Sequence, residues 1–195
     1  MISKDYLDTP IDYVHLSELG SIMGSGGMIV MDEDDCMVDV SKFYLGFAVD
    51  ESCGKCAPCR VGGRTLYNIL ERLTRGQGEK DDIDKIYTIG KAMQKASLCG
   101  LGQTAPNPVL SSLRYFESEY KAHIKDQSCP AGKCKELISY HILADKCIGC
   151  GVCARKCPVN AISGEIRQLH SIDQETCIKC GECYLACKFD AIYVR

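Results

Sequence analysis

The stretch CIGCGVCARKCP at residues 147–158 spaces four cysteines as C-x2-C-x2-C-x3-C and ends on a proline. Residues 177–187, CIKCGECYLAC, repeat this cysteine spacing, so this part of the chain is an internal duplication. Three thiolates separated by two residues on a tight loop can surround one face of an iron–sulfur cube. The glycines between them let backbone N–H groups approach the cluster sulfurs. The duplication therefore predicts two [4Fe–4S] clusters.

The spacing is that of bacterial two-cluster ferredoxins, in which the fourth cysteine of each run binds the other cluster. The first predicted ligand set is Cys147, Cys150, Cys153 and Cys187. The second set is Cys177, Cys180, Cys183 and Cys157. Lys188 stands where the pattern often has proline. This departure affects the turn after Cys187 but none of the predicted ligands. A zinc ribbon built from C-x2-C pairs is the alternative, and the duplicated triple spacing disfavours it.

The residues around these ligands predict a pseudo-symmetric (βαβ)2 ferredoxin unit over residues 139–195. Its expected elements are strands at residues 140–143 and 191–194, a central hairpin at 165–172, and helical turns after Cys153 and Cys183. Basic and acidic residues nearly balance in this segment, which favours a tethered electron relay over a mobile acidic carrier.

Residues 35–126 have helical periodicity and predict a small four-helix bundle. The fourth helix is expected to start with Asn107 as N-cap and Pro108 at the first helical position. The apolar stripes expected to face the core are Met37, Val40, Tyr44 and Phe47; Leu66, Ile69, Leu70 and Leu73; Ile83, Ile86, Tyr87, Gly90 and Met93; and Val109, Leu113, Phe116 and Tyr120.

A further set of cysteines lies in the loops of this predicted bundle. Cys53, Cys56 and Cys59 repeat the two-residue spacing, and Cys99 follows between the third and fourth expected helices. Three cysteines plus one distant cysteine are the ligand count of a [4Fe–4S] cube. Structural zinc held by four cysteines is the alternative, and the triple spacing favours the cube.

Composition sets the class of protein. The chain has 195 residues and 15 cysteines, an odd number that excludes complete internal disulfide pairing. The N-terminal stretch has no apolar core of an export signal, and no apolar run approaches the roughly 20 residues that span a bilayer. The net charge of −3 and the lack of a basic block argue against nucleic-acid binding. Reduced, metal-binding cysteines in a cytoplasmic protein are expected.

Three cysteines remain after the twelve predicted cluster ligands are assigned. Cys129 and Cys134 flank a Pro/Gly turn in the expected linker at residues 127–138, and His123 lies shortly before them. With Cys36 these residues complete a Cys3His donor set, which predicts structural zinc. His141 is the rival histidine, and three unrelated free thiols, with Cys36 packed as a small hydrophobe, are the alternative.

Residues 51–60, ESCGKCAPCR, and 97–108, SLCGLGQTAPNP, carry a family resemblance. They resemble the C-terminal cluster domain of the flavin-bearing NADH dehydrogenase subunit, which occurs in respiratory complex I and in NAD-dependent hydrogenases and formate dehydrogenases. The resemblance covers roughly residues 5–135. The appended two-cluster tail resembles the beta subunit of electron-bifurcating [FeFe]-hydrogenases.

The resemblance implies an FMN- and NAD(H)-binding domain upstream of residue 9, outside this chain. The one glycine-rich piece, residues 24–27, lacks the full G-x-G-x-x-G of a dinucleotide site. Residues 1–34 resemble the end of a small β-rich linker domain, so a short β-containing segment is expected before the bundle. The chain is thus interpreted as a C-terminal portion, or a split version, of a larger subunit.

These observations predict an electron-transfer module that has no catalytic residues of its own. It would relay electrons through three [4Fe–4S] clusters between a flavin site outside this chain and ferredoxin or hydrogenase partners. The resemblance implies, as partners, the flavin/NADH domain, a small thioredoxin-like iron–sulfur subunit, and a hydrogenase or formate dehydrogenase subunit. A redox-sensing or structural iron–sulfur module is the alternative, and an enzyme complete in this chain is disfavoured because no nucleophile motif or cofactor loop is present.

Overall fold

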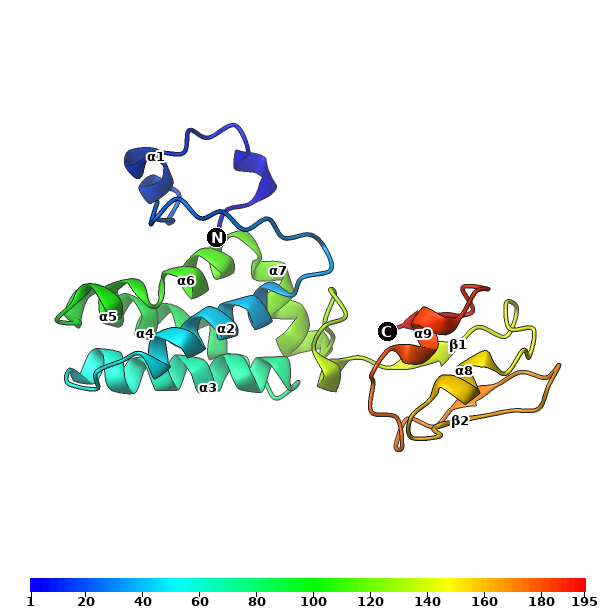
Figure 1. Cartoon of the computed structure of the whole chain (residues 1–195). Coiled ribbons are helices and arrows are strands. Elements are labelled where there is room, and N and C mark those ends of the chain that lie inside the picture. The colour runs from blue at the N-terminus through cyan, green and yellow to red at the C-terminus, as the bar shows by residue number, and fades with distance from the viewer. The chain divides into compact units, whose positions relative to one another are not determined.

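The computed structural model describes all 195 residues and divides the chain into two compact units, Met1–Leu137 and Ile138–Arg195 (Figure 1). The boundary falls inside residues 127–138, the expected linker. The first unit is helical, and the second contains two small sheets and short helices. None of the helices combines the length and the apolarity that crossing a membrane requires.

Four longer helices pack together in the first unit (Figure 1). They are α2 (Met37–Asp50), α3 (Gly63–Thr74), α4 (Asp82–Ala96) and α6 (Asn107–Tyr115), with α1 (Tyr13–Glu18), α5 (Gly100–Thr104) and α7 (Glu117–Lys121) as shorter elements. The core between them includes the fully buried Leu45, Leu66, Leu70, Ile86 and Met93. Burial of these apolar side chains is the main term holding the helices together.

The buried face of α2 differs from the expected stripe. Phe47 is 64% exposed, and the buried positions are Met37, Val38, Ser41, Leu45 and Ala48. The apolar pattern misplaces the buried face of α2 because Ser41 is polar and yet buried. Its hydroxyl donates to the Met37 carbonyl and accepts a hydrogen bond from Tyr120. Tyr87 of α4 is likewise outside the core, with 57% of its surface exposed.

The expected fourth helix is interrupted at Phe116, whose backbone angles (φ −127°, ψ 35°) leave the helical region. The chain continues as α7 and then as a π-helical turn, Ala122–Asp126. After this break the hydroxyl of Tyr120 donates to Ser41 Oγ and Ser112 Oγ, both at 3.1 Å. The interruption therefore accompanies a buried polar contact among α2, α6 and α7.

This contact gives a stability prediction. Tyr120→Phe should lower the free energy of unfolding by about 1 kcal/mol, because it removes the hydrogen bonds of one buried hydroxyl. The loss should be no larger, because Ser41 and Ser112 still donate to the Met37 carbonyl. Chemical denaturation measures the change, and Tyr87→Phe, at an exposed tyrosine on α4, is the matched control. Equal stability of the two variants would contradict a stabilising role for the buried hydroxyl.

Residues 1–34 contain no strand, in contrast to the expected β-containing segment. They hold a 3-10 turn, Lys4–Tyr6, and α1, which begins where the Asp12 carboxylate accepts the N–H groups of Val14 and His15. A strand needs a partner for its backbone, and the exposed apolar residues 28–30 pair with no other segment of the chain. Two side-chain contacts hold the segment on α6: the N-terminal amine donates to Ser111 Oγ, and the hydroxyl of Tyr115 donates to the Leu19 carbonyl.

The second unit contains the duplicated cysteine runs. Its elements are β1 (Tyr140–Ile142), α8 (Val152–Lys156), β2 (Ile162–Ser163), β3 (Ser171–Ile172), α9 (Glu182–Ala186) and β4 (Ile192–Val194). β1 pairs antiparallel with β4, and β2 pairs antiparallel with β3. The helical turns contain Cys153 and Cys183 instead of following them, and the hairpin strands lie at 162–163 and 171–172, so most of residues 165–172 is connecting loop.

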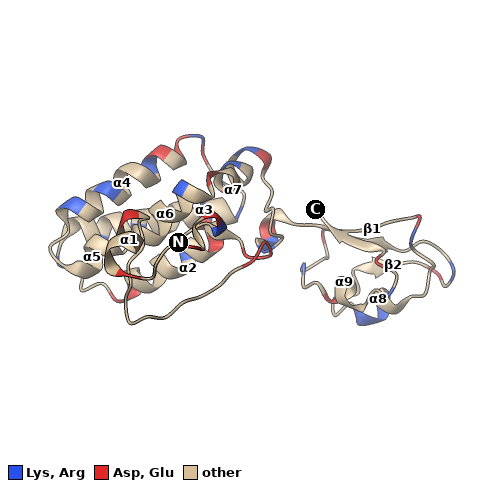
Figure 2. Ribbon diagram, turned by 90° about the horizontal axis from the view of Figure 1, so that it is seen from above, with Lys and Arg blue, Asp and Glu red and all other residues tan.

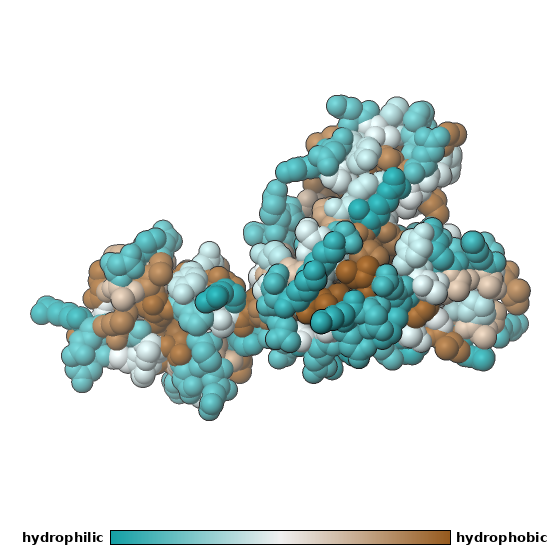
Figure 3. Space-filling view, turned by 180° about the vertical axis from the view of Figure 1, so that it is seen from behind, coloured by the Kyte–Doolittle hydropathy of each residue, from teal (hydrophilic) through white to brown (hydrophobic).

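Each unit also keeps apolar side chains at its surface, which appear brown in the space-filling view (Figure 3). In the second unit Ile148 and Ile178 are exposed at matching places in the two cysteine loops. In the helical unit Leu98, the neighbour of Cys99, is exposed as well. The surface beside each set of predicted cluster cysteines is therefore partly apolar.

Candidate iron–sulfur and zinc centres

The cysteines of the second unit line two cavities, here called the first and second tail cavities. The cysteines of the first are Cys147, Cys150, Cys153 and Cys187. The cysteines of the second are Cys177, Cys180, Cys183 and Cys157. In each cavity three cysteines come from one run and the fourth comes from the other run.

Local backbone geometry shapes these cysteine loops. Gly151 and Gly181 precede α8 and α9 with left-handed φ values of 69° and 80°, which glycine adopts without steric cost. The loops also aim N–H groups at sulfur: Ala161 N donates to Cys157 Sγ at 3.2 Å and Lys179 N to Cys177 Sγ at 3.4 Å. Hydrogen bonds to cluster sulfurs are one of the factors that set the reduction potential of an iron–sulfur centre.

The donor sets of the tail cavities fit a metal cluster electrostatically. Burial, followed by the charge of neighbouring sulfurs, raises the pKa of the Cys153 thiol. The same causes raise the pKa of Cys183 to about 11. Four thiolates in one cavity repel one another unless cations stand between them, and iron supplies that charge.

The helical unit brings together the two loops that carry the upstream set. Cys53 and Cys56 lie in a loop, whereas Cys59 is buried in a π-helical turn, Pro58–Gly62. Cys99 is the exposed residue just before α5. The N–H of Leu98, next to Cys99, is the largest cause that lowers the pKa of Cys56, and the N–H of Cys59 is the second.

Gly102 shows how closely α5 approaches the turn that holds Cys59. A Cβ at Gly102 would lie 3.0 Å from the Cβ of Cys59 and 2.7 Å from Ser97, so only glycine fits there. On the other side of the turn, Ser52 Oγ contacts Cys59 Sγ at 3.3 Å and Arg60 donates to the Gly54 carbonyl at 2.7 Å. Neither α5 nor the π-helical turn is visible in the apolar periodicity of the sequence, since both are shorter than two helical turns.

The three remaining cysteines meet one histidine in the helical unit. The ligand atoms of Cys36, His123, Cys129 and Cys134 all lie within 4.8 Å of one another, and all four residues are buried. His123 Nε2 lies 3.4 Å from both Cys36 Sγ and Cys134 Sγ, and these sulfurs are 3.7 Å apart. The rival, His141, belongs to β1, where its Nε2 contacts Ser139 Oγ at 2.8 Å.

Glu119, which the sequence patterns do not single out, positions two members of this group. The Nδ1–H of His123 donates to the Glu119 carbonyl at 2.7 Å, so Nε2 is the nitrogen that faces the sulfurs. The Glu119 carboxylate accepts the N–H of Met37 at 3.0 Å, next to Cys36. A backbone carbonyl on the second nitrogen of a histidine is a common way to orient a metal ligand.

The protonation of the group also suits a metal site. Hydrogen bonds from Cys134 and Cys36 hold the pKa of Cys129 well below its usual range. Burial acts to lower the pKa of His123, but hydrogen bonds with Cys129 and Cys36 outweigh it and raise the pKa to about 10. A metal ion would replace the proton that the histidine and the thiolates share.

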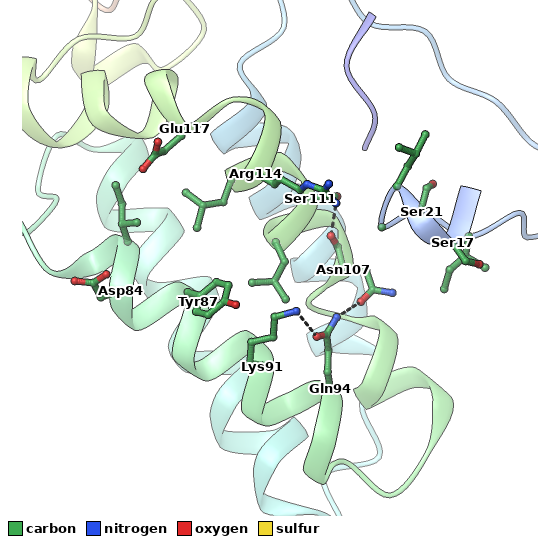
Figure 4. Close-up of a pocket in the computed structure, with 16 residues that line it drawn as sticks. Ser17, Ser21, Asp84, Tyr87, Lys91, Gln94, Asn107, Ser111, Arg114 and Glu117 are labelled. Atoms are coloured by element: carbon green, nitrogen blue, oxygen red, sulfur yellow. Dashed lines mark hydrogen bonds between the residues drawn. The ribbon is translucent and has the colours of Figure 1, made fainter. Parts of the chain in front are cut away.

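A pocket without any cysteine opens between residues 17–22 and helices α4 and α6 (Figure 4). Lys91 donates to Gln94, and Gln94 donates to Asn107, along one side of this pocket. Ser17 and Ser21 lie on the opposite side, on the N-terminal segment (Figure 4). Its lining mixes acidic, basic and apolar groups and includes none of the predicted cluster ligands.

Comparison with known proteins identifies two kinds of iron–sulfur segment. Residues 39–123 match the NADH-ubiquinone oxidoreductase-F iron-sulfur binding region, and residues 140–163 and 170–193 match the 4Fe-4S binding domain. The NADP-reducing hydrogenase subunit HndC of Solidesulfovibrio fructosivorans is 54% identical over 192 residues, which are 98% of this chain and 39% of HndC. Residues 39–123 are therefore similar to the iron–sulfur binding region of NADH dehydrogenase F subunits. All twelve predicted cluster cysteines lie within the matched segments.

Other relatives match part of the chain. The F subunit of NADH-quinone oxidoreductase from Mycobacterium tuberculosis (strain ATCC 25618 / H37Rv) is 39% identical over 130 residues, which are 67% of this chain and 29% of that relative. A crystal structure of NAD+-reducing [NiFe]-hydrogenase in the H2-reduced state covers 49% of this chain and 16% of that chain, with 31% identity and a TM-score of 0.47. The chain therefore spans well under half the length of these relatives.

Proposed function

We propose that the chain is an electron-transfer module of an NAD(P)H-linked oxidoreductase complex and that it holds three [4Fe–4S] clusters. The observation that carries the proposal is the grouping of the tail cysteines. Each tail cavity combines three cysteines of one run with the fourth of the other, which is the ligand arrangement of two-cluster ferredoxins. The order β1-α8-β2, β3-α9-β4 supports a (βαβ)2 unit, and the four long helices support a bundle that holds the third cluster.

A bound cluster supplies reversible one-electron chemistry, and the chain itself determines the surroundings of the cluster. Cys59 and Cys153 are buried, whereas Cys53 and Cys99 are exposed. The exposed pair places one edge of the upstream site at the surface of the helical unit. That position suits electron exchange with a flavin on a separate domain, whereas burial of Cys59 limits access of water and oxidants to the other side of the site.

The partners follow from the family. We propose that an FMN- and NAD(H)-binding domain delivers or receives electrons at the upstream cluster. A small thioredoxin-like iron–sulfur subunit, a hydrogenase or formate dehydrogenase subunit, and soluble ferredoxin are the proposed further partners, in the cytoplasm. The names of two relatives, an NADP-reducing hydrogenase subunit and an NADH-quinone oxidoreductase subunit, support membership of such a complex.

We propose that Cys36, His123, Cys129 and Cys134 bind a structural zinc ion. Three sulfurs and one imidazole nitrogen are a closed tetrahedral donor set with no position open to substrate. The site joins the residue before α2, the π-helical turn after α7, and residues 129–134. Zinc would thereby hold the last residues of the helical unit in place, directly before the second unit begins at Ile138.

A redox titration separates electron transfer from redox sensing. Three clusters that are reduced and reoxidised reversibly at low potential, followed by electron paramagnetic resonance (EPR), support transfer. Slow or irreversible loss of a cluster on oxidation would support sensing instead. The exposed Cys53 and Cys99 make the upstream cluster the informative one, because oxidants can reach two of its ligands directly.

The isolated chain is expected not to oxidise NADH with an artificial electron acceptor, because none of its segments has a dinucleotide-binding motif. Activity should appear once an upstream flavin domain is supplied. Reduction of the same sample by dithionite is the control, since it shows that the clusters can accept electrons. NADH oxidation by the chain alone, or FMN bound in equal amount, would contradict the proposal.

A further inference from the structure

The two tail cavities correspond to each other position by position. Each is lined by twelve residues, and every lining residue of one has its counterpart 30 positions away in the lining of the other. Nine of the twelve pairs are identical residues. The lining pairs that differ are Val152 and Glu182, His170 and Tyr140, and Phe189 and Val159. The duplicated unit is therefore a nearly matched pair of sites with a small number of substitutions between them.

Two of these differences change polarity. The second tail cavity has the carboxylate of Glu182 where the first has the apolar Val152. The first has the imidazole of His170 where the second has the phenol of Tyr140. A cube held by four thiolates is an anion, and its reduction adds a further negative charge. A carboxylate nearby therefore opposes reduction, and a cation or a polar donor favours it.

The matched glycines at the start of α8 and α9 show the same asymmetry. A Cβ at Gly151 would lie 3.3 Å from Arg155 Nη1 and 3.7 Å from His170 Nε2. A Cβ at Gly181 would instead meet the hydroxyl of Tyr140, at 3.1 Å. The counterpart of Arg155 is Leu185, an exposed apolar residue. The basic residues at the end of α8 are visible in Figure 2.

His170 is held firmly in its position. Its side chain is buried, with 3% of the residue exposed, and its Nδ1–H donates to the Gln168 carbonyl at 3.1 Å. Gly164 makes room for the ring, since a Cβ there would lie 2.7 Å from the His170 Cγ. The positive charge of Lys179, in the second cysteine loop, favours reduction of the second cluster and so opposes the effect of Glu182. Lys179 does not line the cavity, however, whereas Glu182 does.

We propose that these substitutions give the two tail clusters unequal reduction potentials. The cluster of the first tail cavity has the higher potential, so an electron entering the tail passes from the second cavity to the first and rests there. In this step one cube loses one electron and the other gains it, with no bond made or broken. The inference rests on the proposed function, because it takes both cavities to hold clusters.

The test exchanges the differing residues in the full chain with its clusters in place. Iron analysis first establishes twelve iron atoms per chain. EPR during redox titration then measures how one electron distributes between the tail clusters. Cys157→Ser, which alters a ligand of the second cavity, assigns the two signals. In the unmodified chain we expect the electron to occupy the first cluster about ten times as often as the second. For one electron this ratio corresponds to a difference of 59 mV between the two reduction potentials.

Glu182→Val and Arg155→Leu should each bring the two populations closer together, and these effects should weaken as salt rises, because both side chains are exposed. His170→Tyr and Tyr140→His exchange one polar ring for another and should move the two populations less than Glu182→Val and Arg155→Leu do. Phe189→Val is the matched control, because it exchanges the one differing lining pair without a change of polarity.

Equal potentials in the unmodified chain, or polar exchanges that move neither potential, would overturn the inference and leave the proposed function intact. A shift produced by Phe189→Val alone would assign the asymmetry to packing, and would likewise overturn it. Fewer than eight iron atoms, which would leave a tail cavity without its cluster, would instead overturn the proposed function and the inference together.

Discussion

Cys99→Ala is expected to lower the iron content of the chain from about twelve atoms to about eight, with both tail clusters retained. Cys99 is the fourth predicted ligand of the upstream cluster and belongs to none of the other donor sets. A [4Fe–4S] cube that loses one of its four thiolate ligands is destabilised as a whole. Iron and sulfide assays on anaerobically purified protein, together with EPR of the reduced protein, measure the loss.

Cys36→Ala is the matched control for this experiment, because it removes a cysteine of the same helical unit that is predicted to bind zinc. It should leave the iron content unchanged. The fold should survive Cys99→Ala, since Cys99 is exposed and lies before a helix of only five residues. If Cys99→Ala left the iron content intact while Cys36→Ala lowered it, the upstream ligand assignment would be wrong.

Cys129→Ser is expected to remove about one zinc ion per chain while all the iron is retained. The buried group of Cys36, His123, Cys129 and Cys134 loses one of its three thiolates in this variant, and hydroxyl oxygen is a poor zinc ligand compared with thiolate. Metal analysis of the unmodified chain and the variant measures the outcome. Zinc absent from carefully metal-replete protein would leave the alternative of three free thiols.

A pair of histidine variants sharpens the zinc experiment. His123→Asn should lose zinc, because Nε2 of His123 is the nitrogen that faces the sulfurs. His141→Asn should keep it, because His141 lies in β1 and contacts Ser139. The loss of zinc should loosen residues 127–137 more than helices α2, α3 and α4, whose apolar core is independent of the site. Amide hydrogen exchange measures this difference.

Motif spacing predicts the tail cluster ligands because a C-x2-C-x2-C run brings its own three sulfurs together by local chain geometry. The crossed fourth ligand also follows from the pattern, and the structure places Cys187 and Cys157 in those cavities. Helix periodicity likewise locates α2, α3, α4 and α6, but α6 begins one residue earlier than predicted, with Pro106 and not Asn107 as its N-cap. It fails on the buried face of α2, because hydrophobicity does not register a buried serine that is satisfied by hydrogen bonds.

Tertiary structure alone decides the features that depend on segments far apart in the chain. The sequence leaves Cys36 and the choice between His123 and His141 open, and only the packing of α2 against α6 and α7 brings Cys36 to His123. The role of Glu119, and the alignment of polar groups in the two tail cavities, also require coordinates. The sequence by itself determined which cysteines fall into runs with cluster-ligand spacing, since that spacing is local. Only the folded chain decided which distant residues meet, because that depends on packing between helices and not on any local pattern.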